Sequence, residues 1–410
     1  MSNRILMLIE NASFPRDNRV RPEAYTLKSA GYDVTVICPV GQDKARYELV
    51  NGVHVYRYPA PPEGEGLFGF IVEYSFAMLW TFVLSLYVWT RHGFDVIHSH
   101  NPPDLFVFLA LFYKLFGKKY IFDHHDLTPE VYQAKTPLGG NAIVHRVLIE
   151  AEKLSCRVAD HVIATNESYK KLEIERSGIP ESKVTVVRNA PDSSHLQQVA
   201  PDPELRQKAS SILCYIGEMA YQDGIDYLLR AFNHLRYKLN REDFYCVLLG
   251  TGSELDKLKE LATELQLNDH VWFYGWANGP ELSLVLSSSD ICVDPDPSNP
   301  FNDRSTMVKM TEYMALGKPI VAFDLPEHRF TAQGAAIYVK DNNEFEFAQA
   351  IERLMDSPEL RNQMGMLGRE RIETKLSWKQ SSANLLDVYS IVLPLSAQLE
   401  HKPQPDLTAS

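Results

Sequence analysis

Short apolar runs alternate with helical patterns along almost the whole chain. The runs in the first half are RILMLIE, VTVICP, VHVYRY, DVIHSH, KYIFDHH and HVIAT, and those in the second half are ILCYIG, YCVLLG, VWFYG, ICVDP and PIVAFD. Patterns of helical length separate them, for example at 21–30, 105–116 and 225–235. Short apolar strands separated by helices are typical of parallel, doubly wound sheets. The pattern therefore predicts an α/β fold with two Rossmann-like domains.

Polar sequence marks the domain boundaries. The run VTVVRNAPD closes the first half, and the stretch 193–209 that follows it is interpreted as a linker. We expect an N-terminal domain over 1–192, a C-terminal domain over 193–376, a last helix over 377–394 that crosses back to the N-terminal domain, and a disordered tail over 395–410. Open parallel sheets bind ligands beyond the carboxyl ends of their strands, so two such sheets predict a cleft between domains.

The segment NDRSTMVKMTEYMALGKPIVAFD, residues 302–324, predicts a helix that binds an anion at its start. Ser305 or Thr306 is the expected N-cap, and Gly317 with Pro319 ends the helix before a buried strand. The backbone N–H groups of the first turn would then lie at the carboxyl end of a strand. Together with the helix dipole they favour phosphate.

Two charged residues share one face of this predicted helix. Lys309 lies near the helix start, where a cation opposes the dipole unless a negative group is close. Glu312 follows three residues later. A solvated ion pair between them is one interpretation, but Lys before Glu is the weaker orientation. We therefore favour an anion near Lys309.

Other loops that follow strands in the second half could complete the site. Gly250-Thr251-Gly252 opens a helix, and glycine lets backbone N–H groups approach a diphosphate, although this motif alone is a weak signal. Gly217 begins a similar loop. Trp276 is either the wall of a nucleobase pocket or a packing residue.

Histidines and carboxylates follow two strands of the first half, in the segments His98–Asn101 and Asp123–Asp126. They could ligate a metal, but they lack the tight spacing of a metal motif, so a polar pocket for hydroxyl groups is the preferred interpretation. The segment 11–21, NASFPRDNRVR, is too polar and basic for packing and is expected to overhang the cleft.

Composition narrows the classes of function. A net charge of -12 over 410 residues argues against a nucleic-acid binder, which needs a basic surface. The five cysteines are widely spaced, and most lie in apolar runs, which indicates reduced core residues of a cytosolic protein. No signal peptide is expected before the first strand. Nucleophilic elbow, Walker loop and Cys/His pairing are not found, which disfavours acyl transfer and nucleotide hydrolysis.

One uncharged segment, 74–90 (YSFAMLWTFVLSLYVWT), complicates a purely soluble interpretation. It is slightly short for a bilayer span, and its aromatic residues are spread along it. It could be a core helix, a helix that also touches a membrane surface, or a true span; the first two are preferred.

These residues, in this order, resemble the family 4 retaining glycosyltransferases of GT-B fold, and in particular a branch associated with bacterial polysaccharide and O-antigen assembly. The likeness extends to about Tyr389. Its most specific pieces are STMVKMTEYMALGKPIVAFD, HNPPDL, DHHDLTPE, GEMAYQDGIDYLLRAF and DNRVRPEA.

The resemblance implies a C-terminal domain that binds a nucleotide sugar, such as a UDP-sugar, with Glu312 on the ribose. The diphosphate would lie on the turn Ser305–Met307, near the loops of Gly217, Gly250, Gly252 and Trp276. His125, with Asp126, would face the donor sugar. The N-terminal domain would take a lipid-linked or saccharide acceptor, with candidate residues Asn11, Asp17, Arg19 and Asn101.

The same resemblance implies that neither metal nor cofactor is needed. The uncharged segment 74–90, together with a lipid-linked acceptor, predicts an enzyme of the cytoplasm that is peripheral to the inner membrane. Two rival readings stay open: a sugar-nucleotide epimerase or phosphorylase on the same fold, and a non-catalytic subunit that binds a sugar nucleotide.

This chain departs from the family pattern at three charged positions. The first Glu of the usual pair, which is separated from Glu312 by seven residues, is replaced by Arg304. The usual Arg and Lys after the first strand of the second domain are replaced by Glu218 and Asp223. Lys309 and Arg304 are therefore the predicted cations for the leaving diphosphate.

Overall fold

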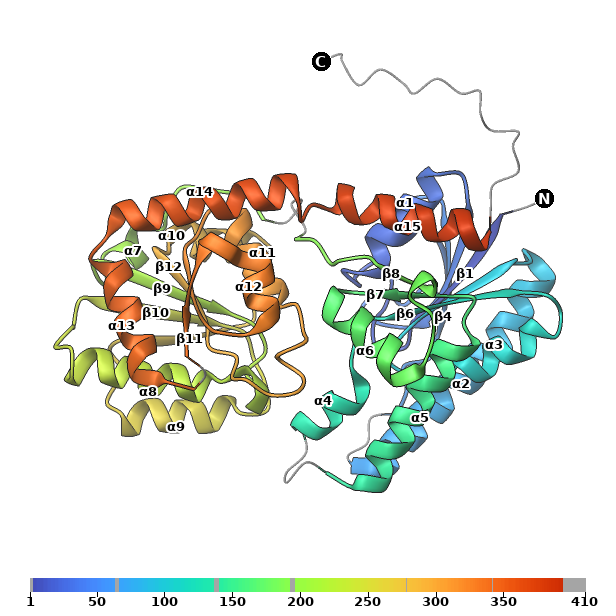
Figure 1. The fold of residues 1–410 in the computed structure, drawn as a ribbon, viewed down its shortest axis with the longest axis horizontal. Coiled ribbons are helices and arrows are strands. Elements are labelled where there is room, and N and C mark those ends of the chain that lie inside the picture. The colour runs from blue at the N-terminus through green and yellow to red at the C-terminus, as the bar shows by residue number, and fades with distance from the viewer. Residues whose placement is uncertain are drawn as a thin grey trace, which may run out of the picture. The chain divides into compact units, whose positions relative to one another are not determined.

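The computed structural model describes residues 3–62, 66–135, 140–191, 196–277, 279–340 and 342–393 (Figure 1). The predicted disordered tail at 395–410 lies outside these residues. The chain forms two compact units. The first comprises Met1–Thr128, Val147–Val187 and Ser382–Ser410, and the second comprises Pro129–Arg146 and Arg188–Ser381.

The first unit contains an eight-stranded sheet in the order β3-β4-β2-β1-β5-β6-β7-β8. Its strands are β1 (Arg4–Leu8), β2 (Asp33–Pro39), β3 (Tyr47–Val50), β4 (Val53–Tyr58), β5 (Val96–His100), β6 (Lys119–His124), β7 (His161–Ala164) and β8 (Val184–Val186). All neighbours pair in parallel except β3, which is antiparallel to β4. The predicted all-parallel sheet is therefore wrong at this edge, because Asn51 and Gly52 both take positive φ angles and form a hairpin turn.

Helices connect and cover these strands. They are α1 (Val20–Ser29), α2 (Gly66–Arg91), α3 (Phe106–Lys114) and α6 (Glu167–Ser177), with α5 (Ala142–Val158) from Val147 on and α15 (Trp378–Val392) from Ser382 on. Helix α4 (Thr128–Lys135) from Pro129 on and the start of α5 belong to the second unit. Strands β5 and β7 are buried along their full length. Both faces of these two strands are buried because helices cover both faces of a doubly wound sheet.

Helix α2 is longer than the predicted segment 74–90. Among the described residues it is the helix that is long and apolar enough, by length and composition, to cross a membrane, over Ile71–Arg91, and only 22% of the tested stretch is buried. Small side chains, Ala77, Thr81 and Ser85, form its buried face. The core-helix interpretation is therefore insufficient, since most of α2 lies at the surface.

The second unit contains a six-stranded parallel sheet in the order β11-β10-β9-β12-β13-β14 (Figure 1). Its strands are β9 (Ser211–Ile216), β10 (Phe244–Leu249), β11 (Val271–Gly275), β12 (Ile291–Asp294), β13 (Ile320–Phe323) and β14 (Ala336–Val339). Its helices are α7 (Pro203–Arg206), α8 (Ile225–Tyr237), α9 (Leu255–Glu264), α10 (Gly279–Ser288), α11 (Val308–Ala315), α12 (Pro326–Ala332), α13 (Glu344–Met355) and α14 (Pro358–Thr374). Separate apolar clusters pack on its two faces. The two Rossmann-like α/β units confirm the predicted fold class.

All five cysteines are buried and carry free thiols, as the apolar runs around them predict.

Candidate donor and transfer sites

The start of helix α11 differs from the prediction. Its N-cap is Met307, which makes no side-chain capping hydrogen bond. The Ser305 hydroxyl instead donates to the Phe301 carbonyl at 2.9 Å, and the Thr306 hydroxyl donates to Glu327 Oε2 at 3.3 Å. The predicted N-cap role of Ser305 or Thr306 is therefore wrong. The first turn of α11 follows Met307 without a capping side chain, a geometry suited to an anionic ligand.

Lys309 is buried in the first turn of α11 and points to two carboxylates. Its Nζ lies 2.8 and 3.0 Å from the two Asp296 oxygens and 3.4 Å from Asp294 Oδ1. Burial alone would lower the pKa of Lys309, but these carboxylates outweigh it and raise the pKa well above its usual value. They also supply the negative charge that a cation in a first helical turn requires. Lys309 is therefore paired with Asp294 and Asp296 in the structure, and its action on a leaving diphosphate stays a prediction.

The predicted glycine loops pack against each other. A Cβ on Gly250 would lie 1.8 Å from the Gly217 carbonyl oxygen, and one on Gly252 would lie 2.4 Å from the Met219 carbonyl oxygen. The Met219 N–H also donates to the Thr251 carbonyl at 3.0 Å. Close contact between the two loops therefore explains both glycines. It brings the loops after β9 and β10 together at the carboxyl edge of the sheet.

Two predicted site residues, Trp276 and Arg304, differ in exposure and in contacts. Trp276 is 79% exposed, which excludes the packing interpretation and leaves it available to a ligand. Arg304 turns back on its own segment, since its Nη1 donates to the Pro300 carbonyl at 2.6 Å. Glu312 is partly buried on α11.

The positions where the family resemblance expects cations carry acids with local roles. Asp223 Oδ2 accepts the Ala220 N–H at 3.1 Å, and Glu218 is exposed. A cation that the sequence reasoning missed lies at the turn before α11: Arg188 Nη1 is 3.4 Å from both Thr306 Oγ1 and Glu327 Oε2. Its position just after the last strand of the first half is the sequence feature that could have identified it.

A buried cluster in the first unit brings together α1, β5 and β6. The Arg19 Nε lies 2.9 Å from both oxygens of Asp123, and its Nη2 lies 3.6 Å from Glu23. His100 Nε2 lies 3.0 Å from Glu23 Oε2. His98 lies against the same carboxylates, at 3.7 and 3.9 Å. Arg19, His98, His100 and Asp123, which were expected to line a ligand cleft, are therefore buried against one another in this cluster.

The charges of this cluster balance internally. Burial and the neighbouring Asp123 raise the pKa of Glu23 to about 8, and burial lowers the pKa of His100 to about 4. Although burial opposes the ionisation of Asp123, the Arg19 guanidinium holds its pKa well below the usual range. At neutral pH a protonated Glu23 thus meets a neutral His100, and Arg19 neutralises Asp123.

Two groups within the described residues have ligand atoms close enough to hold a metal: Glu23, His98, His100 and Asp123, and Asp294, Asp296 and His328. In each group a side-chain cation already lies against the carboxylates, Arg19 in the first and Lys309 in the second. Both groups are thus explained as buried ion clusters, and the absence of a required metal stays a prediction.

Most of the predicted acceptor residues have structural partners. Arg19 is buried, and Asp17 Oδ1 accepts the N–H groups of Arg19 and Val20 at 2.8 and 2.6 Å, at the start of α1. Asn11 is exposed. The expectation that the whole segment 11–21 overhangs a cleft is corrected, since Arg19, one of its three arginines, is buried and neutralises Asp123.

Asn101 is also buried and supports the loop that carries His125 and Asp126. Its Oδ1 accepts the N–H groups of both residues at 2.8 and 3.1 Å, and its Nδ2 donates to Asp104 and to the Asp126 carbonyl. These contacts use its amide fully. The predicted hydroxyl pocket is thus reduced to His125 and Asp126, which are partly exposed.

The C-terminal helix α15 reaches the same cluster. The Tyr389 hydroxyl lies 2.9 Å from His98 Nδ1, although 291 residues separate the two in the sequence. Tyr389 is fully buried and packs against Tyr32 with ring centroids 5.3 Å apart. This helix is therefore part of the support of the polar cluster.

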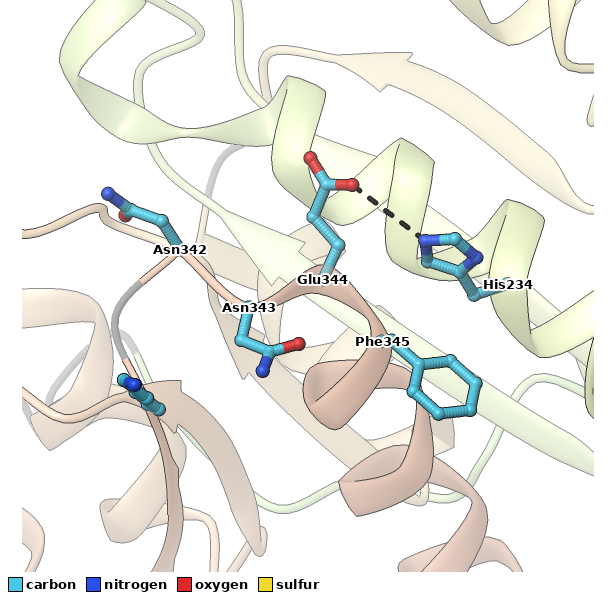
Figure 2. Close-up of a pocket in the computed structure, with 6 residues that line it drawn as sticks. His234, Asn342, Asn343, Glu344 and Phe345 are labelled. Carbon is cyan, nitrogen blue, oxygen red and sulfur yellow. Dashed lines mark ion pairs between the residues drawn. The ribbon is translucent and has the colours of Figure 1, made fainter.

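An open pocket of about 410 Å³ lies elsewhere in the second unit (Figure 2). His234 of α8 lies 3.9 Å from Glu344 at the start of α13, with Asn342, Asn343 and Phe345 around them. None of these is a predicted site residue. Figure 2 shows an ion pair between two packed helices and no convergent set of reactive groups.

Comparison with known proteins supports an assignment. A family described as "Glycosyl transferase 4-like domain" matches residues 17–190, and "Glycosyl transferases group 1" matches residues 197–371. An uncharacterized glycosyltransferase of Methanocaldococcus jannaschii is 25% identical over 386 residues, covering 89% of this chain and 91% of that protein.

Two further likenesses concern proteins with more specific descriptions. The lipopolysaccharide core biosynthesis glycosyltransferase LpsD of Rhizobium meliloti is 29% identical over 176 residues, or 42% of this chain and 48% of LpsD. The structure of Anabaena HepE in complex with UDP-glucose has a TM-score of 0.69 at 16% identity, covering 95% of this chain and 99% of that chain. With its two matching domains and its two Rossmann-like units, the chain belongs to the GT-B glycosyltransferases.

Proposed function

We propose that this glycosyltransferase moves a hexosyl group from a UDP-sugar to a lipid-linked or saccharide acceptor, with retention of configuration, in cell-surface polysaccharide assembly. The observation that carries the donor site is the start of α11, where the N-cap Met307 makes no side-chain capping hydrogen bond and Arg188 lies 3.4 Å from Thr306. The likeness to HepE, solved with UDP-glucose, and to LpsD supports the donor and the pathway class.

The chemistry follows from the charge that must be stabilised. Breaking the sugar–phosphate bond leaves a nucleoside diphosphate with increased negative charge. Backbone N–H groups of the first turn of α11 and the guanidinium of Arg188 are fixed before the reaction and can stabilise that charge. The acceptor hydroxyl attacks from the face of the leaving group, and the diphosphate takes its proton, so the anomeric configuration is retained. We propose that His125 of the first unit acts on the sugar that is transferred.

The test is a thermal-shift screen of the whole protein with UDP, GDP and a panel of nucleotide sugars, followed by a hydrolysis assay without acceptor. A ligand that binds only the folded state raises its stability. Stabilisation by a UDP-sugar together with slow hydrolysis is expected. Stabilisation without hydrolysis would favour a non-catalytic subunit, a reading motivated by Glu218 and Asp223. If no nucleotide stabilised the protein, the proposal would be wrong.

Glu312→Gln is expected to weaken UDP binding by about 1.5–3 kcal/mol, because a carboxylate that accepts two ribose hydroxyls makes charge-assisted hydrogen bonds. Isothermal titration with UDP measures the loss, and titration with ribose-free pyrophosphate serves as the control. Unchanged UDP affinity would move the ribose site elsewhere.

We also propose that the enzyme docks on the cytoplasmic face of the inner membrane through α2. Its outer face repeats every four residues, with Ile71, Leu79, Val83 and Tyr87 exposed by 54%, 63%, 47% and 52%. Ring contact between Phe82 and Phe112 packs α3 against α2. On α3 and just after it, further apolar residues are exposed: Phe108, Leu111, Leu115 and Phe116. An apolar helical face of this kind can enter the boundary between headgroups and acyl chains.

The double variant Leu79→Ser/Val83→Ser is expected to bind anionic liposomes about tenfold more weakly or worse. Transfer of one apolar side chain from water into an apolar environment contributes up to about 1.5–3 kcal/mol to the free energy of binding, and two such side chains are lost. Co-sedimentation measures this. A matched control, Met366→Ser/Leu367→Ser, changes two exposed apolar residues of α14, 67% and 44% exposed, and should bind as the parent does. Equal binding by parent and α2 variant, or none by the parent, would contradict docking through this face.

A further inference from the structure

We propose that Asp123 is a positioning residue that fixes the imidazole of His125 through its Nδ1 and thereby holds Nε2 in one direction, as contact with a substrate requires. The role of Nε2 toward a substrate rests on the proposed function. The contact itself does not, because it belongs to the first unit alone.

The geometry of β6 places the two side chains together. His125 Nδ1 lies 3.3 Å from Asp123 Oδ1. The Asp123 side chain is fully buried, whereas His125 keeps 13% of its side chain exposed. Asp123 cannot rotate away, since Arg19 bonds to both of its oxygens at 2.9 Å. The carboxylate is therefore fixed on one side of the ring.

The backbone of His125 is fixed as well. Asn101 Oδ1 accepts the His125 N–H at 2.8 Å. With the main chain and Nδ1 both held, the remaining ring nitrogen, Nε2, has a defined direction. A hydrogen bond at one ring nitrogen decides which tautomer is present, so Asp123 selects the form protonated at Nδ1.

The charged and titratable groups around His125 agree with an ionised Asp123. These groups are Arg19, His100, Asp104, Asp123, His124 and Asp126. Burial alone would lower the pKa of His125, but the hydrogen bond and charge of Asp123 outweigh it and raise the pKa. Loss of the carboxylate should reverse that direction.

The strand offers a matched control one residue away. His124 Nδ1 lies 2.9 Å from Glu173 Oε1, and both side chains are fully buried. Glu173→Gln thus changes a buried carboxyl group beside a neighbouring histidine without touching His125. Burial raises the pKa of Glu173 well above its usual value, so this variant tests the loss of a buried carboxyl hydrogen bond without the loss of a charge. A merely structural effect of losing such a group would affect both variants alike.

The first experiment needs no variant. Nitrogen-15 NMR of the histidine rings in the whole protein should show neutral His125 as the Nδ1–H tautomer. The Asp123→Asn variant should lower the titration midpoint of His125 and reduce kcat by roughly 10- to 100-fold with little change in KM for the donor, as for carboxylates that orient metal-bound histidines. Glu173→Gln should leave the His125 midpoint and kcat near those of the parent.

An Nε2–H tautomer in the parent would overturn the proposal even if Asp123→Asn failed to fold. So would an unchanged His125 midpoint in a folded Asp123→Asn. If the parent showed the Nδ1–H tautomer but no transfer from any nucleotide sugar, the proposed function would fail while the Asp123–His125 contact stood. Equal loss of kcat in Asp123→Asn and Glu173→Gln would also overturn it.

Discussion

Replacing Lys309 with methionine is expected to destabilise the second unit by about 3–5 kcal/mol, because it leaves two buried carboxylates without their cation. Asp294 and Asp296 are 0% and 1% exposed, and Lys309 Nζ is within 3.4 Å of both. Urea unfolding followed by circular dichroism measures the change in the free energy of unfolding.

A matched control is Lys340→Met, which removes an exposed lysine of the same unit and should change stability by less than about 0.5 kcal/mol. Adding Asp294→Asn to Lys309→Met should recover part of the loss, because the pKa of Asp294 is held below its usual value and this substitution removes a buried charge. If Lys309→Met were as stable as the parent but lost turnover, the lysine would act on the substrate and its ion cluster would not be structural.

Arg188→Gln is expected to reduce turnover by roughly 100- to 1000-fold, because one preorganised group that stabilises the leaving diphosphate is lost. Its guanidinium lies next to Thr306, at the turn before α11. Steady-state kinetics with saturating donor measures kcat, and the effect should be similar for every donor sugar, since the diphosphate is common to all.

The variant Glu327→Gln distinguishes a role of Arg188 on the diphosphate from a role in holding the turn before α11. It weakens the same ion pair, at 3.4 Å, but keeps the cation, so it should retain most of the activity. Equal losses in the two variants would indicate that the pair only holds the turn. Full activity of Arg188→Gln would contradict the phosphate role and make Arg304 the next candidate. For an Arg304 variant, a loss of activity confined to acidic donor sugars would indicate a contact with the sugar.

Local sequence pattern was sufficient for the fold class and for most strands, but it did not identify the elements α12, β14, α13 and α14. Apolar runs between helical patterns identify buried parallel strands, because such strands are covered on both faces. The helix that became α11 was also placed correctly from its sequence between 302 and 324. A hairpin signal was missed as well: Asn51-Gly52 between two short strands predicts a hairpin, and β3 with β4 forms it.

The sequence by itself thus determined two Rossmann-like units and located the charged and polar residues at the carboxyl ends of their strands, because burial and helix or strand periodicity are local properties. Only the tertiary structure decided which of those groups meet. Lys309 was expected to face a ligand but lies on Asp294 and Asp296 from another strand end, and Arg19 was expected to be exposed but neutralises Asp123, 104 residues away. Partners of buried charges depend on which segments the fold brings together, and that is not encoded in the spacing around any one residue.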